Sequence, residues 1–347
     1  MKAQQVFLHT VAIIVVGTAA VRGAEEVRAP GLVLTTENDL YANVFKYGGQ
    51  DRHYTQGLKI MYIGGDKDFT AISSLLNRWV PKLGLQNEAC NVGFAIGQNM
   101  YTPINKLSYS AIPGDWPYAG LLYGSLIFQR RGTTGNSVPT LDSYELDIGV
   151  VGPASFAKDI QRQWHRWIAG DLPQGWANQL KNEPGLELKC ARYWRLTPNE
   201  KVGRYFDFVP HVGADIGNIR LDANAGGFLR FGYNLPQDFG VSLIDGTAPS
   251  IAPVKTEKGR WFSCHIFVGG EGRIVGRDIF LDGNSFAHSL SVNKENLVGD
   301  FMWGGGFMLF QHFEANFTGV IRGDRFENQP GGTDAIGSIT VKAIFPL

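Results

Sequence analysis

Long stretches of this sequence alternate between polar and apolar residues, which restricts the chain to a sheet-forming fold. In residues 140–151 one parity carries Glu145 and Asp147, and the other carries Leu146 and Ile148. Because successive side chains of a strand point to opposite faces, this pattern gives one polar and one apolar face. The alternation alone fits a soluble sandwich as well as a membrane barrel. Many of the runs, however, are about 10–14 residues long, which suits tilted membrane-spanning strands better than average globular strands of about 5–6 residues.

Twelve segments carry the pattern, and closed bacterial barrels have an even number of strands. A further segment, 277–290, is interpreted as an excursion because Asp282-Gly283-Asn284 is a turn sequence. The predicted fold is therefore all-β: a closed, antiparallel, 12-stranded transmembrane β-barrel with a short α-helix in an extracellular loop. We expect the strands at residues 32–40, 54–64, 90–101, 118–131, 140–151, 185–197, 204–218, 224–234, 260–274, 300–311, 313–326 and 333–345.

The composition agrees with a barrel and excludes several other classes. The chain has 44 glycines, 12% aromatic residues and only 18% charged residues. Lys+Arg and Asp+Glu both number 32, so no basic excess exists to neutralise nucleic-acid phosphates, and no nucleic-acid partner is expected. The 44% hydrophobic share is too low for a helical membrane protein and too high for a disordered chain. Cys90, Cys190 and Cys264 fit no metal-binding spacing and are expected to be small apolar side chains on strands.

Residues 1–24 have the features of a secretory signal peptide. Lys2 precedes an apolar run over 11–16, and small residues follow, with cleavage expected between Ala20 and Glu25. The run is far shorter than the roughly 20 residues that a membrane-spanning helix requires. The two predicted units are thus a signal peptide (1–24) and an exported β-barrel (25–347), located in the bacterial outer membrane.

One helix is expected, over 155–168. Its apolar residues fall on one face at 100° per residue, and they include Phe156, Ile160 and Trp167. A second short helix is expected over 176–181. Residues 235–258 contain three prolines and are expected to form a loop.

The strand order brings several polar segments to one rim of the barrel. If the first strand runs outward, the outer rim holds the end of strand 32–40, the start of 54–64, the end of 90–101 and the helix. The rim is then the main candidate for a site. Its segments are Glu37-Asn38-Asp39, His53-Tyr54-Thr55, Gln98-Asn99-Met100-Tyr101, Gly114-Asp115 and the helix 155–168.

Three groups of rim residues suggest chemistry. His165 and Gln161 are one helical turn apart, so both project from the same side, where a histidine can act as a general base. Asp39 and Asn38 offer hard oxygen ligands of the kind that calcium takes, and Thr55 offers a hydroxyl. Each group also has an ordinary structural explanation: a surface histidine on an interfacial helix, turn formation at a strand end, and a lumen-facing strand residue. The chain has no Gly-x-Ser-x-Gly elbow of the serine hydrolases.

Taken together, these segments resemble the lipid A 3′-O-deacylase family of Gram-negative outer membranes. The resemblance covers nearly the whole mature chain and is strongest over 38–176. The motifs that carry it are Thr36-Glu37-Asn38-Asp39, Tyr54-Thr55-Gln56-Gly57-Leu58, Gln98-Asn99-Met100-Tyr101-Thr102-Pro103, Gly114-Asp115-Trp116-Pro117-Tyr118-Ala119-Gly120, Asp147-Ile148-Gly149-Val150-Val151-Gly152-Pro153, Gln161 with His165, and Gly170-Asp171.

The resemblance implies an ester hydrolase that removes the 3′-O-linked acyloxyacyl chain from lipid A in the outer leaflet. His165 would activate the attacking water, and Ca²⁺ held near Asn38 and Asp39 would stabilise the oxyanion. Gln161 and Thr55 would orient the water or the substrate.

The family also suggests further site residues and partners. Asp171 stands where the family has an acidic residue, here one methylene shorter than Glu. The chain departs from the basic residues that the family carries just after its Tyr-Ser-Pro, so Lys106, Arg162 and Arg166 are the candidates for binding the phosphates of lipid A instead. The expected partners are lipid A or lipopolysaccharide and outer-membrane lipids, and the protein is expected to be a monomer. The alternatives are an outer-membrane phospholipase and a non-catalytic barrel that acts as a pore or scaffold.

Overall fold

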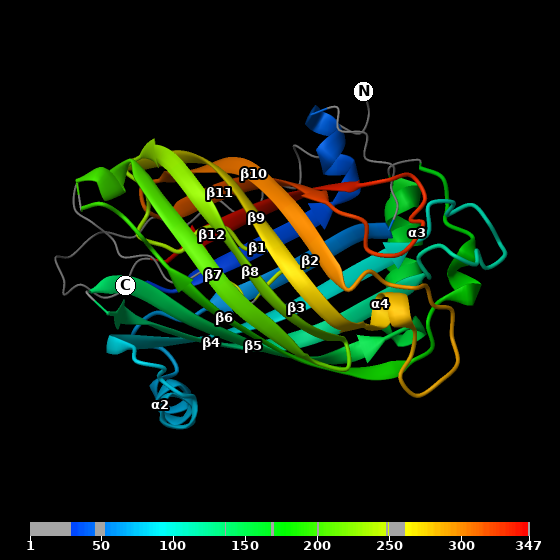
Figure 1. Ribbon diagram of the computed structural model, residues 1–347, viewed down its shortest axis with the longest axis horizontal. Helices are drawn as coiled ribbons and strands as arrows, with labels where there is room; N and C mark the ends of the chain where they lie inside the picture. Colours follow the sequence, from blue (N-terminus) through cyan, green and yellow to red (C-terminus); the bar gives the residue numbers. More distant parts are fainter. Residues whose placement is uncertain are drawn as a thin grey trace.

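The chain folds into a closed antiparallel barrel of twelve strands, in which neighbours in sequence pair with each other and the first strand pairs with the last (Figure 1). The computed structural model describes residues 29–45, 53–135, 137–167, 170–199, 201–247, 249 and 261–345. The predicted fold and strand number are confirmed. The predicted signal peptide, residues 1–24, lies outside the described residues.

The strands are long, as the alternating runs predict, and all twelve overlap the expected segments. Segment 277–290 is confirmed as an excursion, since its strand ends at Asp278 and a short helix follows. The bounds are β1 Gly31–Asn38, β2 His53–Ile63, β3 Gln86–Thr102, β4 Ala119–Thr134, β5 Val138–Val151, β6 Glu183–Trp194, β7 Phe206–Gly217, β8 Arg220–Tyr233, β9 Phe262–Asp278, β10 Leu297–Leu309, β11 Phe313–Arg322 and β12 Asp334–Ile344.

The two faces of the wall differ in the way the alternation requires. Apolar side chains point outward, as shown by Ile96 and Ile148, which are 57% and 62% exposed. The opposite parity turns charged side chains into the lumen, where Lys59 pairs with the fully buried Glu145. An apolar exterior around a polar interior is the arrangement of a membrane barrel and the reverse of a soluble one. The three cysteines are half-buried free thiols, as expected.

Short helices occupy both ends of the barrel. The helix expected over 155–168 begins as a 3₁₀ turn, continues as α3 and leaves Ile168 outside the described residues. The helix expected over 176–181 is instead the 3₁₀ turn η3, and α2 was not expected. Within the described ranges, every helix is too short or too polar to cross a bilayer. The bounds are η1 Asp39–Phe45, α2 Thr70–Trp79, η2 Pro153–Ser155, α3 Ala157–Trp167, η3 Gly175–Asn178, η4 Val202–Arg204 and α4 Ile279–Asp282.

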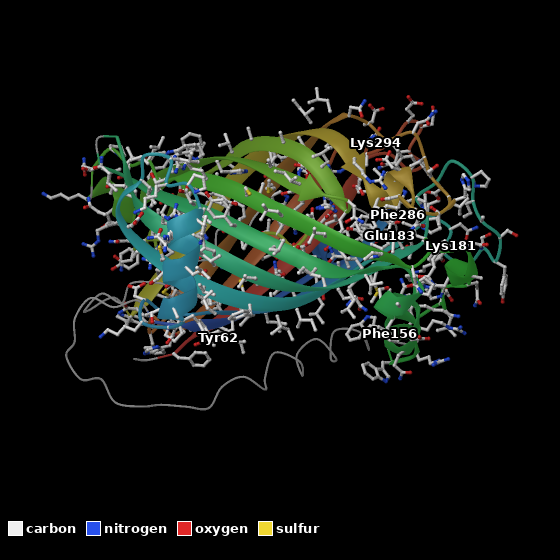
Figure 2. The ribbon with its side chains drawn as sticks, turned by 90° about the horizontal axis from the view of Figure 1, so that it is seen from below. Tyr62, Phe156, Lys181, Glu183, Phe286 and Lys294 are labelled. Carbon is white, nitrogen blue, oxygen red and sulfur yellow. The ribbon has the colours of Figure 1, made fainter. Side chains whose placement is uncertain are left out.

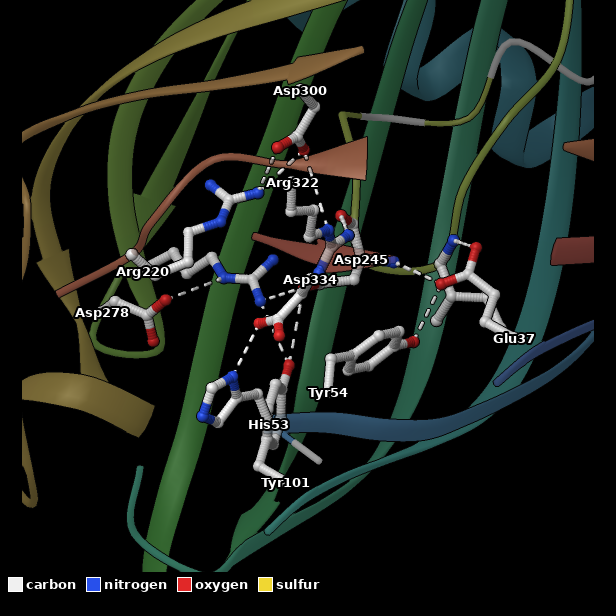
Figure 3. Close-up of polar contacts among 12 residues, drawn as sticks. Glu37, His53, Tyr54, Tyr101, Arg220, Asp245, Asp278, Asp300, Arg322 and Asp334 are labelled. Carbon is white, nitrogen blue, oxygen red and sulfur yellow. Dashed lines mark hydrogen bonds and ion pairs between the residues drawn. The ribbon is translucent and has the colours of Figure 1, made fainter. Parts of the chain in front are cut away.

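The loop after β8 returns into the barrel interior. Its Asp245 forms ion pairs with Arg220 of β8 and Arg322 of β11, and its backbone N–H donates to Glu37 of β1 (Figure 3). These three strands lie around the barrel, so a residue that contacts all of them lies inside it. The predicted loop is therefore confirmed over its described part, and it contributes polar and apolar side chains to the lumen.

Candidate active site

The rim segments do converge, but the barrel wall divides them into two groups. Glu37 lies inside, where it accepts a hydrogen bond from the hydroxyl of Tyr54 at 2.9 Å. Asn38, the next residue of β1, belongs to the outward-facing parity. The candidate residues for chemistry are in the outer group, between the wall and the loop helix.

Helix α3 and the preceding turn pack against the outside of β3 and β4. Gln98 of β3, which shares its parity with the exposed Ile96, donates from Nε2 to the carbonyl oxygen of Ser155 at 2.6 Å. Gly120 of β4 permits the close approach, because a Cβ at this position would lie 2.2 Å from the Ser155 Oγ and 2.3 Å from the Ala157 Cβ. The helix is thus seated on the outer side of the wall.

The polarity of α3 is reversed relative to a helix on a soluble protein. Its apolar residues point away from the barrel, and Trp167 is 67% exposed. Phe156, just before the helix, is likewise exposed and lies outside the wall (Figure 2). Gln161 and His165 face the wall and are only 1% and 6% exposed. The apolar face therefore suits contact with lipid, while the polar pair lines the space between helix and wall.

His165 is held in one orientation by the backbone that follows the helix. Its Nδ1 lies 2.5 Å from the carbonyl oxygen of Asp171. A carbonyl only accepts, so Nδ1 carries the proton in the neutral ring, and the lone pair is on Nε2. Burial lowers the pKa of His165 below its ordinary value of 6.5, more than the Asp171 carbonyl raises it, and the charge of Lys106 lowers it further. The ring is therefore a neutral base at neutral pH.

Asp171 thus orients His165 through its main chain. Its side chain is exposed, and the contact that orients His165 comes from its carbonyl group. The position of this carbonyl depends on the loop conformation and not on side-chain length. The difference of one methylene from Glu has no bearing on this contact.

Lys106 interacts electrostatically with residues at the end of β1 and with residues on and after helix α3. The charges of Asp39 and Asp171 both raise its pKa, although burial has the larger effect and lowers it overall. The charge of Lys106 also lowers the pKa of His165, so this ammonium group is close enough to influence the ring that we consider for the base.

Gln161 is anchored at one end of its amide only. Its Oε1 accepts a hydrogen bond from Trp176 Nε1 at 2.8 Å, and Trp176 is itself buried between Tyr118 and the wall. The buried Nε2 of Gln161 has no hydrogen-bond partner among the residues that the structure describes. Because an unsatisfied buried donor costs about 1–3 kcal/mol, such a group is a candidate for binding water or substrate.

Thr55 occupies an irregularity in the wall. The register between β2 and β3 shifts between Tyr54 and Gln56, so Thr55 is an extra residue that forms a β-bulge. Bulges re-aim side chains and are frequent beside active sites. The Thr55 Oγ1 lies 2.6 Å from the Oγ1 of Thr102, which shares the outward parity of Gln98. The contact with Thr102 depends on the pairing of β2 with β3 and has no signature in the sequence.

Asn38 and Asp39 end β1 at the site. The Asn38 Oδ1 accepts from the N–H of Leu40 at 2.8 Å, which is the turn chemistry considered above. The Asp39 carboxylate is buried and lies near Lys106. A buried carboxylate and an amide oxygen are donors that calcium accepts. Within the described part of the chain, however, no three His, Cys, Asp or Glu side chains are grouped as a metal cluster. The donors therefore fit calcium in kind, as a partial ligand set.

The two arginines of α3 differ in their surroundings. Arg166 is exposed and donates to Gln163 at 3.4 Å. Arg162 is half-buried, and its Nε has no hydrogen-bond partner among the described residues. Both arginines lie on the helix that carries Gln161 and His165.

The inner group of rim residues forms a network that sequence spacing did not reveal. His53 lies between two carboxylates, with Nδ1 2.7 Å from Asp334 and Nε2 3.3 Å from Asp115. Its ring stacks on Trp116 with centroids 5.5 Å apart. The partners come from the connection between β3 and β4 and from the start of β12, so only the fold brings them to His53.

Comparison with known proteins finds a matching family and a similar solved structure. A family model described as "Outer membrane protein LpxR" matches residues 7–345. The solved structure of LpxR from Salmonella typhimurium is similar with a TM-score of 0.71 at 19% identity, covering 91% of this chain and 100% of that one. No curated protein matches the chain.

Two autotransporter barrels are more distant. The β domain of BrkA from Bordetella has a TM-score of 0.42 at 10% identity, covering 92% of this chain and 100% of that one. The translocator domain of NalP from Neisseria meningitidis has a TM-score of 0.39 at 11% identity, covering 99% and 95%. Similarity at this level carries no functional argument.

Proposed function

The chain belongs to the LpxR family of outer membrane proteins, the lipid A 3′-O-deacylases, and we propose that His165 is the general base of its ester hydrolysis. The observation that carries the proposal is the reversed helix α3. It turns an oriented histidine and a buried amide donor toward the wall, while its apolar face points outward. A site on the outside of the barrel is open to a substrate that resides in the membrane.

The chemistry follows from the tautomer of His165. Nε2 accepts a proton from a water molecule as the water oxygen attacks the ester carbonyl carbon. When the tetrahedral intermediate collapses, the bond between the acyl carbon and the 3′ oxygen breaks, and the imidazolium returns the proton to that oxygen. The products are a free acyloxyacyl acid and a 3′-hydroxyl group. The Asp171 carbonyl holds the ring in place throughout.

The neighbouring residues orient the reactants. The Gln161 Nε2 is placed to donate to the water or the substrate. The Thr55 hydroxyl, at the bulge near the start of β2, is proposed to border the same site. Calcium, when bound by Asp39 and Asn38, would supply positive charge to the developing oxyanion. Lys106, Arg162 and Arg166 are proposed to bind the phosphates, because the charge of Lys106 acts on His165, both arginines lie on the helix of His165, and phosphates favour Arg and Lys.

The proposal predicts a large loss of activity in a His165→Ala variant. Loss of a positioned general base lowers kcat by about 10²–10⁴-fold. The measurement is release of acyl chains from purified lipid A, with folding checked by heat-modifiable migration on gels. His288→Ala, which removes an exposed histidine of the loop after β9, is the matched control. Equal rates for wild type and His165→Ala would show that His165 is not the base.

A second experiment addresses calcium. Excess EGTA is expected to abolish activity, and added Ca²⁺ is expected to restore it. Asp39→Asn should raise the Ca²⁺ concentration for half-maximal activity at least about tenfold, because it removes a charged ligand. Asp159→Asn, an exposed position on α3, should leave that concentration unchanged. Activity that persists unchanged in EGTA would refute calcium dependence while leaving the role of His165 intact.

A further inference from the structure

The second helix on the outside of the wall, α2, has no role in the site. It follows β2 at the barrel end opposite α3, and Figure 2 shows it lying across the outside of the strands. Phe69, just before the helix, makes an edge-on contact with Phe94 at 5.3 Å between ring centroids and with Tyr62 at 6.1 Å. Phe94 belongs to the outward parity of β3. The start of α2 therefore rests on the apolar outer surface of the barrel.

An outward-facing arginine fastens the other end of α2. Arg130 of β4 alternates with Gln129, whose side chain reaches a carbonyl in the lumen, so Arg130 points outward. Its guanidinium is fully buried and donates to the Asn77 Oδ1 at 2.8 Å and to the carbonyl oxygens of Val80 and Pro81 at 2.9 Å. A cation that satisfies C-terminal carbonyls also interacts favourably with the helix dipole.

The chain beyond the helix is fastened in the same way. Arg192 of β6 donates to the carbonyl oxygen of Leu83 at 2.8 Å while it pairs with Asp142 of β5. The segment 80–83 is thus held along the outside of several strands. Its position relative to the wall is fixed by hydrogen bonds to two arginines.

The face of α2 that points away from the barrel is apolar. Leu75 is 58% and Trp79 74% exposed, and the nearby Leu83 is 66% exposed. The Arg78 guanidinium lies 5.9 Å from the centre of the Trp79 ring. A tryptophan next to an arginine is typical of residues at the level of lipid headgroups. This apolar face continues the apolar outer surface of the barrel through Phe69.

We propose that α2 is an interfacial helix that inserts Leu75 and Trp79 into the phospholipid leaflet at this end of the barrel. An amphipathic helix that lies flat in the interface buries its apolar face about 5–10 Å into the boundary between headgroups and acyl chains. That this leaflet is the periplasmic one rests on the proposed function, which places α3 in the outer leaflet. The contact with lipid is independent of the enzyme activity.

The experiment uses the full-length protein, with its three cysteines replaced by alanine, in vesicles of phosphatidylethanolamine and phosphatidylglycerol. A single substitution, Leu75→Cys or Ser74→Cys, provides the thiol that carries an environment-sensitive fluorophore. The two positions are adjacent and both exposed, but they are 100° apart on the helix. Lipids brominated in the acyl chain should quench the Leu75 label at least twofold more than the Ser74 label, and aqueous iodide should show the reverse preference. Heat-modifiable migration verifies that each variant is folded.

Two outcomes would overturn the proposal. Equal quenching of both labels by iodide, without quenching by brominated lipid, would show that this face contacts water. Protection of the Leu75 label that vanishes on dilution of the protein in lipid would show that a second copy of the chain covers it. Because neither readout involves lipid A hydrolysis, failure here is distinguishable from failure of the proposed function.

Discussion

Glu37 and Asn38 are adjacent in β1, yet their side chains lie on opposite sides of the barrel wall and have different partners. Glu37 is fully buried in the lumen and accepts from Tyr54 and from the backbone of the inserted loop. Asn38 borders the outer site, where the Gln161 Nε2 has no partner among the described residues. Groups that satisfy one another stabilise a structure, whereas positioned groups without a partner are available for chemistry. The network around Glu37 thus has a structural role, and the unpaired Gln161 amide supports the catalytic role that we propose for the outer site.

The largest expected effect is a loss of stability when the ion pairs of Asp245 inside the barrel are removed. Asp245→Ala leaves Arg220 and Arg322 buried without their shared carboxylate, which costs about 3–5 kcal/mol. Thr247→Ala removes only the hydrogen bond to Tyr193 from the same loop and should cost about 1 kcal/mol. Urea unfolding in vesicles measures both. The folded Asp245→Ala variant should keep a kcat within about tenfold of wild type. A larger loss of kcat would show that the lumen takes part in catalysis and would contradict the division between lumen and outer site.

The outer group provides an intermediate effect, on activity. Gln161→Leu removes the buried donor and is expected to lower kcat about 10–100-fold, equivalent to about 1.4–2.7 kcal/mol. Stability should fall by only about 1 kcal/mol, because Trp176 loses its acceptor. The exposed Gln163→Leu variant of the same helix is the control. If Gln161→Leu lost stability and kept its kcat, the amide would be a structural group like those of the lumen.

The smallest expected effect is on pH dependence. Because the neutral ring of His165 is the active form and its pKa is lowered, activity should persist below pH 6.5 and fall only on further acidification. Lys106→Met removes a charge that lowers this pKa, so the acid limb of the kcat profile should move to higher pH. If the acid limb of Lys106→Met stays at the wild-type pH, the charge of Lys106 does not lower the pKa of His165.

The barrel could be predicted from the sequence because one physical rule governs it throughout. Alternation along each run gives the strand and its two faces, and the even strand count gives closure. The helix pair Gln161 and His165 was predicted for a similar reason, since a spacing of one turn is visible in the chain. These are local patterns, and the fold preserves them.

The remaining features depend on contacts between distant segments. The bulge at Thr55 and its partner Thr102 are set by the register of two strands. The orientation of His165 depends on a backbone carbonyl, which has no sequence signature. Helix α2 had a weak signal, in that its apolar residues recur at helical spacing. Arg130, which fixes the helix in place, lies far from it in the chain.

The most direct test of the central claim is the lipid A mass spectrum of cells that express the protein. Wild-type protein is expected to remove one acyloxyacyl chain from the 3′ position, and His165→Ala, present in the outer membrane at equal level, is expected to leave lipid A intact. Identical spectra for wild-type and His165→Ala cells, or loss of a chain from another position, would contradict the account.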